Sequence, residues 1–189
     1  MHRATLLARL RAHRPTDAKE RADRDHIIDF VTRNADCFGK ANPRGHITGS
    51  AFIVDPTGRF LLTHHAKLKR WLQVGGHSDP GEHDPLQTAL REAREESGLT
   101  DLEPLGLTPL DVDVHRIPAR TKASGRVEAA HDHLDVRYVL RTRTPDAIVL
   151  TEESTALRWF PFEAIAHLGL DAAAMRAARK ARSAAAQLG

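Results

Sequence analysis

The sequence has almost no cysteine: Cys37 is the one thiol among 189 residues. A single cysteine excludes an internal disulfide and any zinc site built from several thiolates. Long apolar runs are missing too, since no stretch approaches the roughly 20 residues of a membrane-spanning helix. The basic start of the chain lacks the extended apolar region of a signal peptide. We therefore expect a cytoplasmic enzyme or binding module that has no contact with a membrane.

A strong charge of either sign is also missing, because the formal net charge at pH 7 is only +3. This balance is compatible with anionic small molecules, including nucleotides, but it does not indicate a surface dedicated to nucleic acid. Hydrophobic residues make up 41% of the chain, which is enough to bury the core of a folded domain. Composition therefore favours an enzyme or a module that binds a small ligand.

Periodicity and turn residues divide the chain into helices and strands. Helices are expected over 2–13 and 16–35, the second capped by Thr16, and a strand hairpin over 46–55 and 59–65. The later expectations are strands within 102–119 and 133–142, a flexible loop over 120–132, a short strand and helix within 151–165, and a last helix capped by Asp171. This order predicts an α/β layered sandwich with a mixed sheet over 41–189, preceded by an N-terminal helical extension over 1–40.

One segment, GGHSDPGEHDPLQTALREAREESGL, carries the strongest helix signals. Asp84 can cap a helix, Pro85 suits its first position, and Gly98 suits the left-handed residue beyond its end. These signals predict a helix over 85–97.

Three glutamates lie on one face of this predicted helix, at Glu92, Glu95 and Glu96. The spacings i, i+3 and i+4 bring like charges within about 5–6 Å, and the repulsion destabilises the helix slightly. Arg91 can pair with Glu95 and relieve part of it. The face is either a solvated surface of alternating charges or a cation site. The preceding glycine pair favours the cation, because a tight turn there exposes a carbonyl, and carbonyl and carboxylate oxygens bind hard divalent cations.

The segment from Gly76 to Leu99 resembles the Nudix box, the signature G-x5-E-x7-R-E-U-x-E-E-x-G-U in which U is a bulky apolar residue. Gly76, Glu82 and the run REAREESGL that starts at Arg91 match it. The sequence departs from the signature twice: eight residues separate Glu82 from Arg91, and the first U position holds the small Ala93. The extra residue falls before or at the helix start, so it affects the position of Glu82 relative to the helix. The resemblance implies a Nudix-like α/β/α sandwich.

The resemblance also implies a hydrolase that cleaves the diphosphate linkage of a nucleoside diphosphate derivative by attack of water at phosphorus. It implies Mg²⁺ as the cofactor, with Mn²⁺ as an alternative, because divalent cations neutralise charge on a diphosphate and activate water. The implied catalytic residues are Glu92, Glu95 and Arg91, of which Arg91 orients a glutamate. The implied metal ligands are Gly76 through its carbonyl, Glu92, Glu95 and Glu96, with Glu82 acting through water.

A second polar stretch, HDHLDVRY over 131–138, is predicted to enter a strand. Alternation places His133, Asp135 and Arg137 on one face and apolar residues on the other. An acid, an imidazole and a guanidinium together suit a phosphate-bearing ligand, so these three residues and His77 are predicted to bind substrate. The alternatives are an ordinary solvent-facing surface and a buried structural ion pair. Further candidates for the general base are Glu128, Glu152 and Glu153.

Two other functions stay open. A nucleotide-binding sensor module would use the same fold without turnover, although the intact Arg91 and the glutamates favour an enzyme. An isomerase of isoprenoid diphosphates is chemistry that a Nudix-like fold also hosts, but it usually relies on a cysteine beside the metal site. Cys37 is predicted to lie far from that site, in an N-terminal helix, so the hydrolase is preferred. The N-terminal helices are expected to pack on the main domain or on a second copy in a homodimer.

Overall fold

The computed structural model describes residues 2–121, 125, 127–151 and 154–187. Its centre is a mixed sheet with the strand order β10-β2-β1-β9-β5, extended by β3 on β2, β4 on β1 and β6 on β9. β1 and β9 run parallel, whereas the other pairs in the sheet are antiparallel. The strands are β1 (Gly45–Val54), β2 (Phe60–His65), β3 (Trp71–Leu72), β4 (Val74–His77), β5 (Glu103–Pro104), β6 (Asp111–Ile117), β9 (His131–Arg141) and β10 (Ser154–Phe160).

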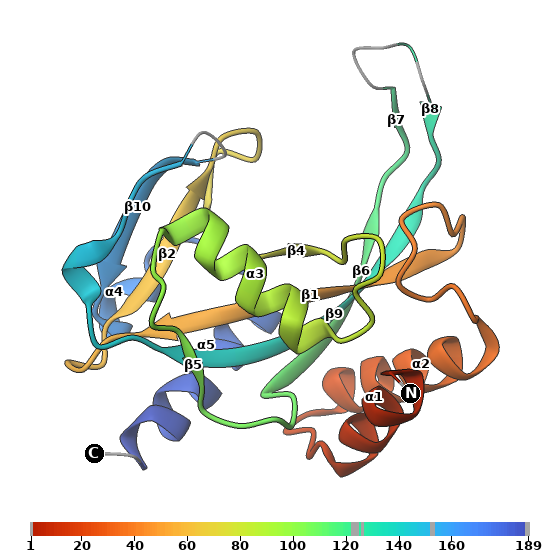
Figure 1. Cartoon of the computed structure of the whole chain (residues 1–189), viewed down its shortest axis with the longest axis horizontal. Coiled ribbons are helices and arrows are strands. Elements are labelled where there is room, and N and C mark those ends of the chain that lie inside the picture. The colour runs from red at the N-terminus through yellow and green to blue at the C-terminus, as the bar shows by residue number, and fades with distance from the viewer. Residues whose placement is uncertain (1, 122–124, 126, 152–153, 188–189) are drawn as a thin grey trace.

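Helices cover both faces of this sheet, and a small hairpin of β7 with β8 extends from one end (Figure 1). Helix α3 crosses one face, α5 lies behind the other, and α1 and α2 pack together at one end of the molecule. The helices are α1 (His2–Ala12), α2 (Ala18–Arg33), α3 (Pro85–Ser97), α4 (Phe162–Ile165) and α5 (Ala172–Ala186), and the hairpin strands are β7 (Arg120–Thr121) and β8 (Val127–Glu128).

Each face of the sheet has its own apolar core. The core on the α3 face includes Ile47, Val136, Leu86 and Ala89. The core on the α5 face includes Phe52, Phe60, Ala177 and Ala178. Because strand side chains alternate between faces, two covered faces give strands that are buried along most of their length, as in β1. The predicted α/β/α sandwich with a mixed sheet is therefore confirmed.

The N-terminal helices pack on the main domain, which is one of the two arrangements that we expected. Leu6 and Leu10 of α1 and Ile27 of α2 belong to the same apolar cluster as the α3 face. Arg9 donates to both carboxylate oxygens of Asp84, at 2.9 and 3.0 Å. Since Asp84 caps α3, this ion pair joins the extension to the start of the box helix.

Two local predictions are wrong. The N-cap of α2 is Asp17 rather than Thr16: Glu20 N–H donates to the Asp17 carboxylate at 2.8 Å, while the Thr16 hydroxyl bonds the Glu20 carboxylate at 3.0 Å. The loop expected over 120–132 contains the paired strands β7 and β8, and β9 begins at His131.

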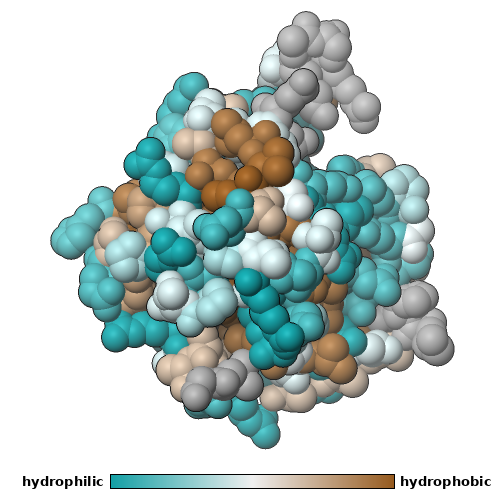
Figure 2. Space-filling view, turned by 60° about the vertical axis from the view of Figure 1, so that its left-hand side comes forward, coloured by the Kyte–Doolittle hydropathy of each residue, from teal (hydrophilic) through white to brown (hydrophobic). Residues whose placement is uncertain are grey.

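Among the described residues, no helix is long and apolar enough to cross a membrane. Figure 2 shows a face of mixed polarity with one apolar patch near its upper edge. The large apolar side chains that are most exposed in the described part of the chain are Leu68, Leu107, Val127, Val149 and Leu150.

Candidate active site

Helix α3 begins and ends where its sequence predicts. Leu86 N–H donates to the Asp84 carboxylate at 3.0 Å, and Pro85 occupies the first turn. At the other end, Gly98 has a φ of 74° and its N–H donates to the Arg94 carbonyl. A side chain would be strained in that left-handed conformation. Both ends of α3 are fixed, so its charged face has a defined orientation relative to the sheet.

Arg91 is the centre of that charged face. Its guanidinium donates to the Glu82 carboxylate at 3.1 and 3.2 Å, to Glu92 at 3.0 Å and to Glu95 at 2.8 Å. It also donates to the His77 carbonyl at 2.7 Å. Burial by itself would lower the pKa of Arg91, but the surrounding carboxylates raise it above its ordinary value. One permanently charged arginine thus joins three glutamates to the loop that precedes the helix.

Glu92 and Glu96 lie against the backbone of β4. Gly75 N–H donates to Glu96 Oε1 at 2.8 Å, and Glu96 is only 8% exposed. Gly76 is so close to Glu92 that an added Cβ would lie 2.4 Å from Oε1 of that carboxylate. A residue with a side chain would therefore displace Glu92, and glycine lets the two carboxylates and the strand backbone meet in one place.

Glu82 joins the cluster despite the extra residue in the box. Its carboxylate also accepts from Asp79 N–H at 3.0 Å and from the Thr88 hydroxyl at 3.1 Å. Burial opposes ionisation of Glu82, but Arg91 and these donors hold its pKa below the ordinary value. The insertion is absorbed in the loop ahead of α3. Glu95, by contrast, has a side chain that is 58% exposed and open to solvent.

The donor set suits a hard divalent cation. Glu92, Glu95 and Glu96 offer carboxylate oxygens, and the neighbouring Gly76 offers a backbone carbonyl. Arg91 balances only part of the negative charge of these carboxylates, and the remainder would attract a cation.

A family model described as the NUDIX domain matches residues 44–182, well over half of the chain. The chain belongs to the Nudix family. The match begins just before β1 and extends into α5, so it covers the sheet, the box and the helices on both faces. With its box helix intact, this Nudix protein is a diphosphate hydrolase, an enzyme that acts on acid anhydrides in phosphorus-containing compounds.

Curated relatives of this Nudix chain carry two kinds of name. A "Probable DHNTP pyrophosphohydrolase" of Lactococcus lactis subsp. cremoris (strain MG1363) is 32% identical over 122 residues, which are 64% of this chain and 69% of the relative. An "Isopentenyl-diphosphate Delta-isomerase" of Nocardia farcinica (strain IFM 10152) is 35% identical over 136 residues, 68% of this chain and 71% of the relative. An Ap4A hydrolase binary complex from C. elegans shares the fold, with a TM-score of 0.54 and 22% identity over 75% of this chain and 98% of its own.

Asp135 and Arg137 share the sheet face opposite α3, as alternation predicts, but both are buried. Arg137 is 3% exposed, and its guanidinium donates to Asp135 at 2.8 Å, to Asp113 at 3.2 Å and to Asp111 at 3.4 Å. Asp135 in turn accepts from two hydroxyls of β1. Enclosure of the guanidinium by three carboxylates favours the buried ion pair, which was one of the alternatives for this stretch.

His77 and His133 meet on the same face, with their Nε2 atoms 3.2 Å apart, and His46 and His131 lie beside them. Burial, together with the neighbouring histidines, lowers the pKa of His46 and of His77 to about 4 and that of His133 to about 2. Our sequence analysis missed His46 and His131. His131 could have been found from its two-residue spacing to His133, but His46 requires the β1–β9 pairing, which joins residues far apart in the sequence.

Of the remaining base candidates, Glu128 is not brought to the glutamate helix. Glu128 lies in the β7–β8 hairpin, where Arg120 donates to its carboxylate at 2.6 Å. Glu152 and Glu153 lie outside the described residues.

Cys37 does not lie in a helix, contrary to the sequence prediction. It lies in the turn after α2, and its carbonyl accepts from Ile47 N–H at 2.7 Å. The separation of Cys37 from the box along the sequence therefore does not indicate where Cys37 lies in the fold. The thiol is fully buried in the apolar core, and burial raises its pKa to about 11. An unreactive, protonated thiol follows from this environment.

Proposed function

We propose that the protein hydrolyses the diphosphate linkage of a nucleoside diphosphate derivative, with Mg²⁺ as its cofactor and Mn²⁺ as the alternative. The observation that carries the proposal is the Arg91 cluster, in which one guanidinium holds Glu82, Glu92 and Glu95 beside the backbone of β4. Carboxylates that repel one another do not stabilise the fold, whereas their oxygens can together bind a cation. The name of the L. lactis relative supports a phosphoanhydride substrate.

Glu92, Glu95, Glu96 and the Gly76 carbonyl would hold the cation. Bound Mg²⁺ supplies charge neutralisation on the diphosphate and a more acidic water. Glu95 is the proposed general base, because its exposed carboxylate can reach solvent while Arg91 keeps it in one orientation. Arg91 is a positioning residue that acts through Glu92 and Glu95, and its hydrogen bond to the His77 carbonyl keeps the loop against the helix.

The substrate is proposed to be a small molecule rather than a nucleic acid, bound where His77 and His133 emerge from the sheet. Neutral imidazoles there can donate to phosphate oxygens. The predicted direct contact of Asp135 and Arg137 with substrate stays a prediction. Their burial supports an indirect role instead, in which they hold the local strand structure beside the histidines.

The isomerase is the second candidate, and the N. farcinica relative favours it. An isomerase of this kind would be expected to use a reactive thiol at the metal site. Cys37 is the chain's one cysteine and is buried with a raised pKa, which argues against that chemistry. A sensor without turnover is disfavoured by the intact charged face of α3.

A panel of diphosphates tests these alternatives directly. The full-length protein is incubated with nucleoside diphosphate derivatives and isoprenoid diphosphates in Mg²⁺ or Mn²⁺, and both phosphate release and isomeric products are measured. We expect hydrolysis that excess chelator abolishes and that Glu96→Gln suppresses. The matched control is Glu163→Gln, which changes an exposed glutamate paired with Arg182 on a different face. Isomeric product without hydrolysis would overturn the proposal, and ligand binding without turnover would favour the sensor.

We further propose that residues 1–40 form the extension and 41–189 the catalytic domain, and that the protein acts in the cytoplasm. The cytoplasmic location rests on the single cysteine. A homodimer through the extension stays a prediction, to be tested by sedimentation or light scattering of the purified protein.

A further inference from the structure

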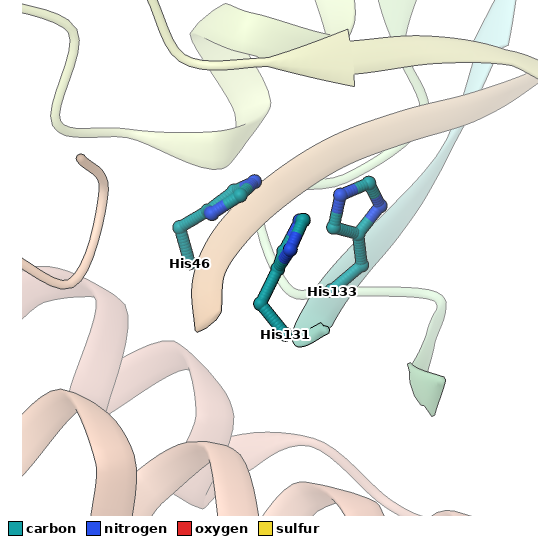
Figure 3. Close-up of side chains that lie close together, drawn as sticks. All are labelled: His46, His131 and His133. Atoms are coloured by element: carbon teal, nitrogen blue, oxygen red, sulfur yellow. The ribbon is translucent and has the colours of Figure 1, made fainter. Parts of the chain in front are cut away.

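Three histidines converge at one end of the sheet, on the face away from α3. His46 is the second residue of β1, and the parallel pairing places it directly opposite His133 of β9. His131 precedes His133 by two residues and so shares its face. Each offers a ring nitrogen, and these nitrogens all lie within 4.8 Å of one another. Figure 3 shows the three rings gathered around a common space.

His46 is the member that the fold by itself does not explain. The residue is 2% exposed, and neither of its ring nitrogens has a hydrogen-bond partner. A buried polar group without a partner destabilises the fold, because it loses its hydrogen bonds to water and gains none in return. The ring lies among other imidazoles, with centroids 4.9 Å from His77, 5.2 Å from His131 and 4.9 Å from His133. An unpartnered nitrogen facing other nitrogens has the surroundings of a metal ligand.

His131 and His77 are also arranged as ligands usually are. His131 Nδ1 donates to the Ala129 carbonyl at 2.8 Å, which leaves the lone pair on Nε2. Metal-bound histidines generally make such a bond, because it fixes the tautomer and the ring orientation. His77 Nε2 lies 3.2 Å from His133 Nε2. Two nitrogens bound tetrahedrally at the usual Zn–N distance lie about 3.3 Å apart, so this pair already has the required separation.

We propose that His46, His131 and His133 bind one divalent transition-metal ion of the zinc class, with His77 as the fourth nitrogen ligand. Imidazole nitrogen is a preferred ligand of zinc, whereas Mg²⁺ prefers oxygen. Rotation of the rings that moves each nitrogen by about an ångström brings the more widely separated nitrogens to the spacing of a tetrahedral site. The ion would join β1, β4 and β9 at one end of the sheet. Binding of the ion by His77 and His133 would replace the contact with substrate phosphate that is proposed above for these two residues.

This site differs from the proposed Mg²⁺ site in both chemistry and position. Gly76 faces Glu92 of α3, while the next residue of β4, His77, pairs across from Thr48 and faces the opposite side of the sheet. The charged groups near the histidines are Lys40, Glu128 and, through its bond to His115, Asp113. The inference therefore goes beyond the proposed hydrolase activity and does not depend on it.

Metal titration of the full-length protein tests the proposal. The protein is stripped with chelator, and Zn²⁺ binding is measured by calorimetry in excess Mg²⁺, with Co²⁺ as a spectroscopic probe of tetrahedral nitrogen coordination. We expect one equivalent of Zn²⁺ that Mg²⁺ does not displace, and a rise in the melting temperature on binding. Because loss of a supporting hydrogen bond alone costs 10–100-fold in affinity, His131→Ala and His46→Ala are each expected to weaken binding by more than about 100-fold.

The matched controls separate this site from the glutamates and from histidines elsewhere. His26→Ala, on the exposed side of α2, and Glu96→Gln should both bind Zn²⁺ as the unaltered protein does. Absence of Zn²⁺ binding, or binding that Glu96→Gln removes and His131→Ala keeps, overturns the proposal. If His46→Ala fails to fold, ring ¹⁵N shifts of the unaltered protein decide. Zn²⁺ should move those of His46, His131 and His133, and unchanged shifts would refute the site.

Discussion

Two arginines in this protein each lie among several carboxylates, and they do so in opposite environments. Arg91 lies on α3 at the box, with a side chain that is 22% exposed, and Arg137 lies inside β9, with a side chain that is 4% exposed. The partners of Arg91 are Asp79, Glu82, Glu92 and Glu95, and those of Arg137 are Asp111, Asp113 and Asp135. A solvent-accessible cluster can admit a cation and a substrate, whereas an enclosed cluster can only hold the fold together.

The Arg137 cluster also extends into two helices of the structure, α2 and α5. Arg176 of α5 donates to both oxygens of Asp111, at 2.7 and 3.0 Å, and Lys19 of α2 donates to Asp113 at 2.7 Å. Glu20 of α2 accepts from Lys180 of α5. Charged residues therefore join the extension, the sheet and the last helix. The role of a charge cluster depends on its burial more than on its composition.

The largest effect is expected from deleting residues 1–40, which removes Lys19 and Glu20 from the buried network and exposes the apolar face beneath the extension. Six large buried apolar side chains are lost, each worth about 1.5–3 kcal/mol, so at least about 10 kcal/mol is at stake, comparable with the whole stability of a domain. They are Leu6, Leu10, Ile27, Phe30, Val31 and Phe38, and the buried Cys37 is lost with them. We expect the product to be unfolded or aggregated by circular dichroism and size-exclusion chromatography. A stable monomer of 41–189 would contradict this.

Replacing Arg137 should cost stability rather than chemistry. Arg137→Met removes the guanidinium that three buried aspartates share, and loss of one partner in a buried pair costs about 3–5 kcal/mol. Urea unfolding measures the loss, and kcat of the protein that remains folded should be close to normal. If Arg137→Met keeps its stability but loses substrate affinity, the residue contacts substrate after all, as the sequence predicted.

Glu96→Gln and Glu92→Gln are expected to have the reverse profile. Each should lower kcat at least about 100-fold, or ~2.7 kcal/mol of barrier, because a carboxylate oxygen is lost from the proposed cation site. Stability should hardly change, since glutamine can still accept the Gly75 N–H and one repelling charge is removed. Steady-state kinetics measure the expected fall in kcat, and thermal melts measure the stability. Near-normal kcat in both variants would show that these carboxylates do not hold the cation.

Arg91→Lys should have a smaller effect than loss of a glutamate. Lysine keeps the charge but cannot bond Glu82, Glu92, Glu95 and the His77 carbonyl together, because an ammonium lacks the planar fork of donors. We expect kcat to fall roughly tenfold, or ~1.4 kcal/mol, with KM little changed, if Arg91 positions the glutamates rather than binding substrate. A rise in KM at constant kcat would instead place Arg91 in contact with the substrate.

The smallest effect concerns pH and the buried network. Burial alone would raise the pKa of Glu20, but hydrogen bonds from His13 and Lys180 hold it well below its ordinary value. A carboxyl with a lowered pKa stabilises the fold above its unfolded pKa of about 4.3, and this contribution is lost as the pH falls further. Burial raises the pKa of Asp111, which acts in the opposite direction. Urea unfolding from pH 7 to pH 3 should show a steeper loss for the unaltered protein than for Glu20→Gln. Equal slopes would show that Glu20 does not cause the loss of stability at low pH.

Local sequence signals were sufficient to predict the box helix, because the residues that determine its ends and its charged face are close in sequence. Asp84, Pro85 and Gly98 fix its two ends, and the spacing of Glu92, Glu95 and Glu96 fixes their common face. The alternation in β9 likewise predicted that His133, Asp135 and Arg137 share a face. It could not predict that the face is covered, because the covering residues come from β6, α2 and α5, which are distant along the chain.

The sequence by itself determined the family, the box helix and the layered α/β architecture, since these depend on periodicity, capping and a contiguous motif. The tertiary structure decided the roles of the remaining polar residues. Parallel pairing of β1 with β9 brought His46 to His131 and His133, and packing of α2 and α5 enclosed Arg137. The physical reason is that burial and through-space distance set the free energy of a charge or an imidazole, and both depend on contacts between residues that the sequence keeps far apart.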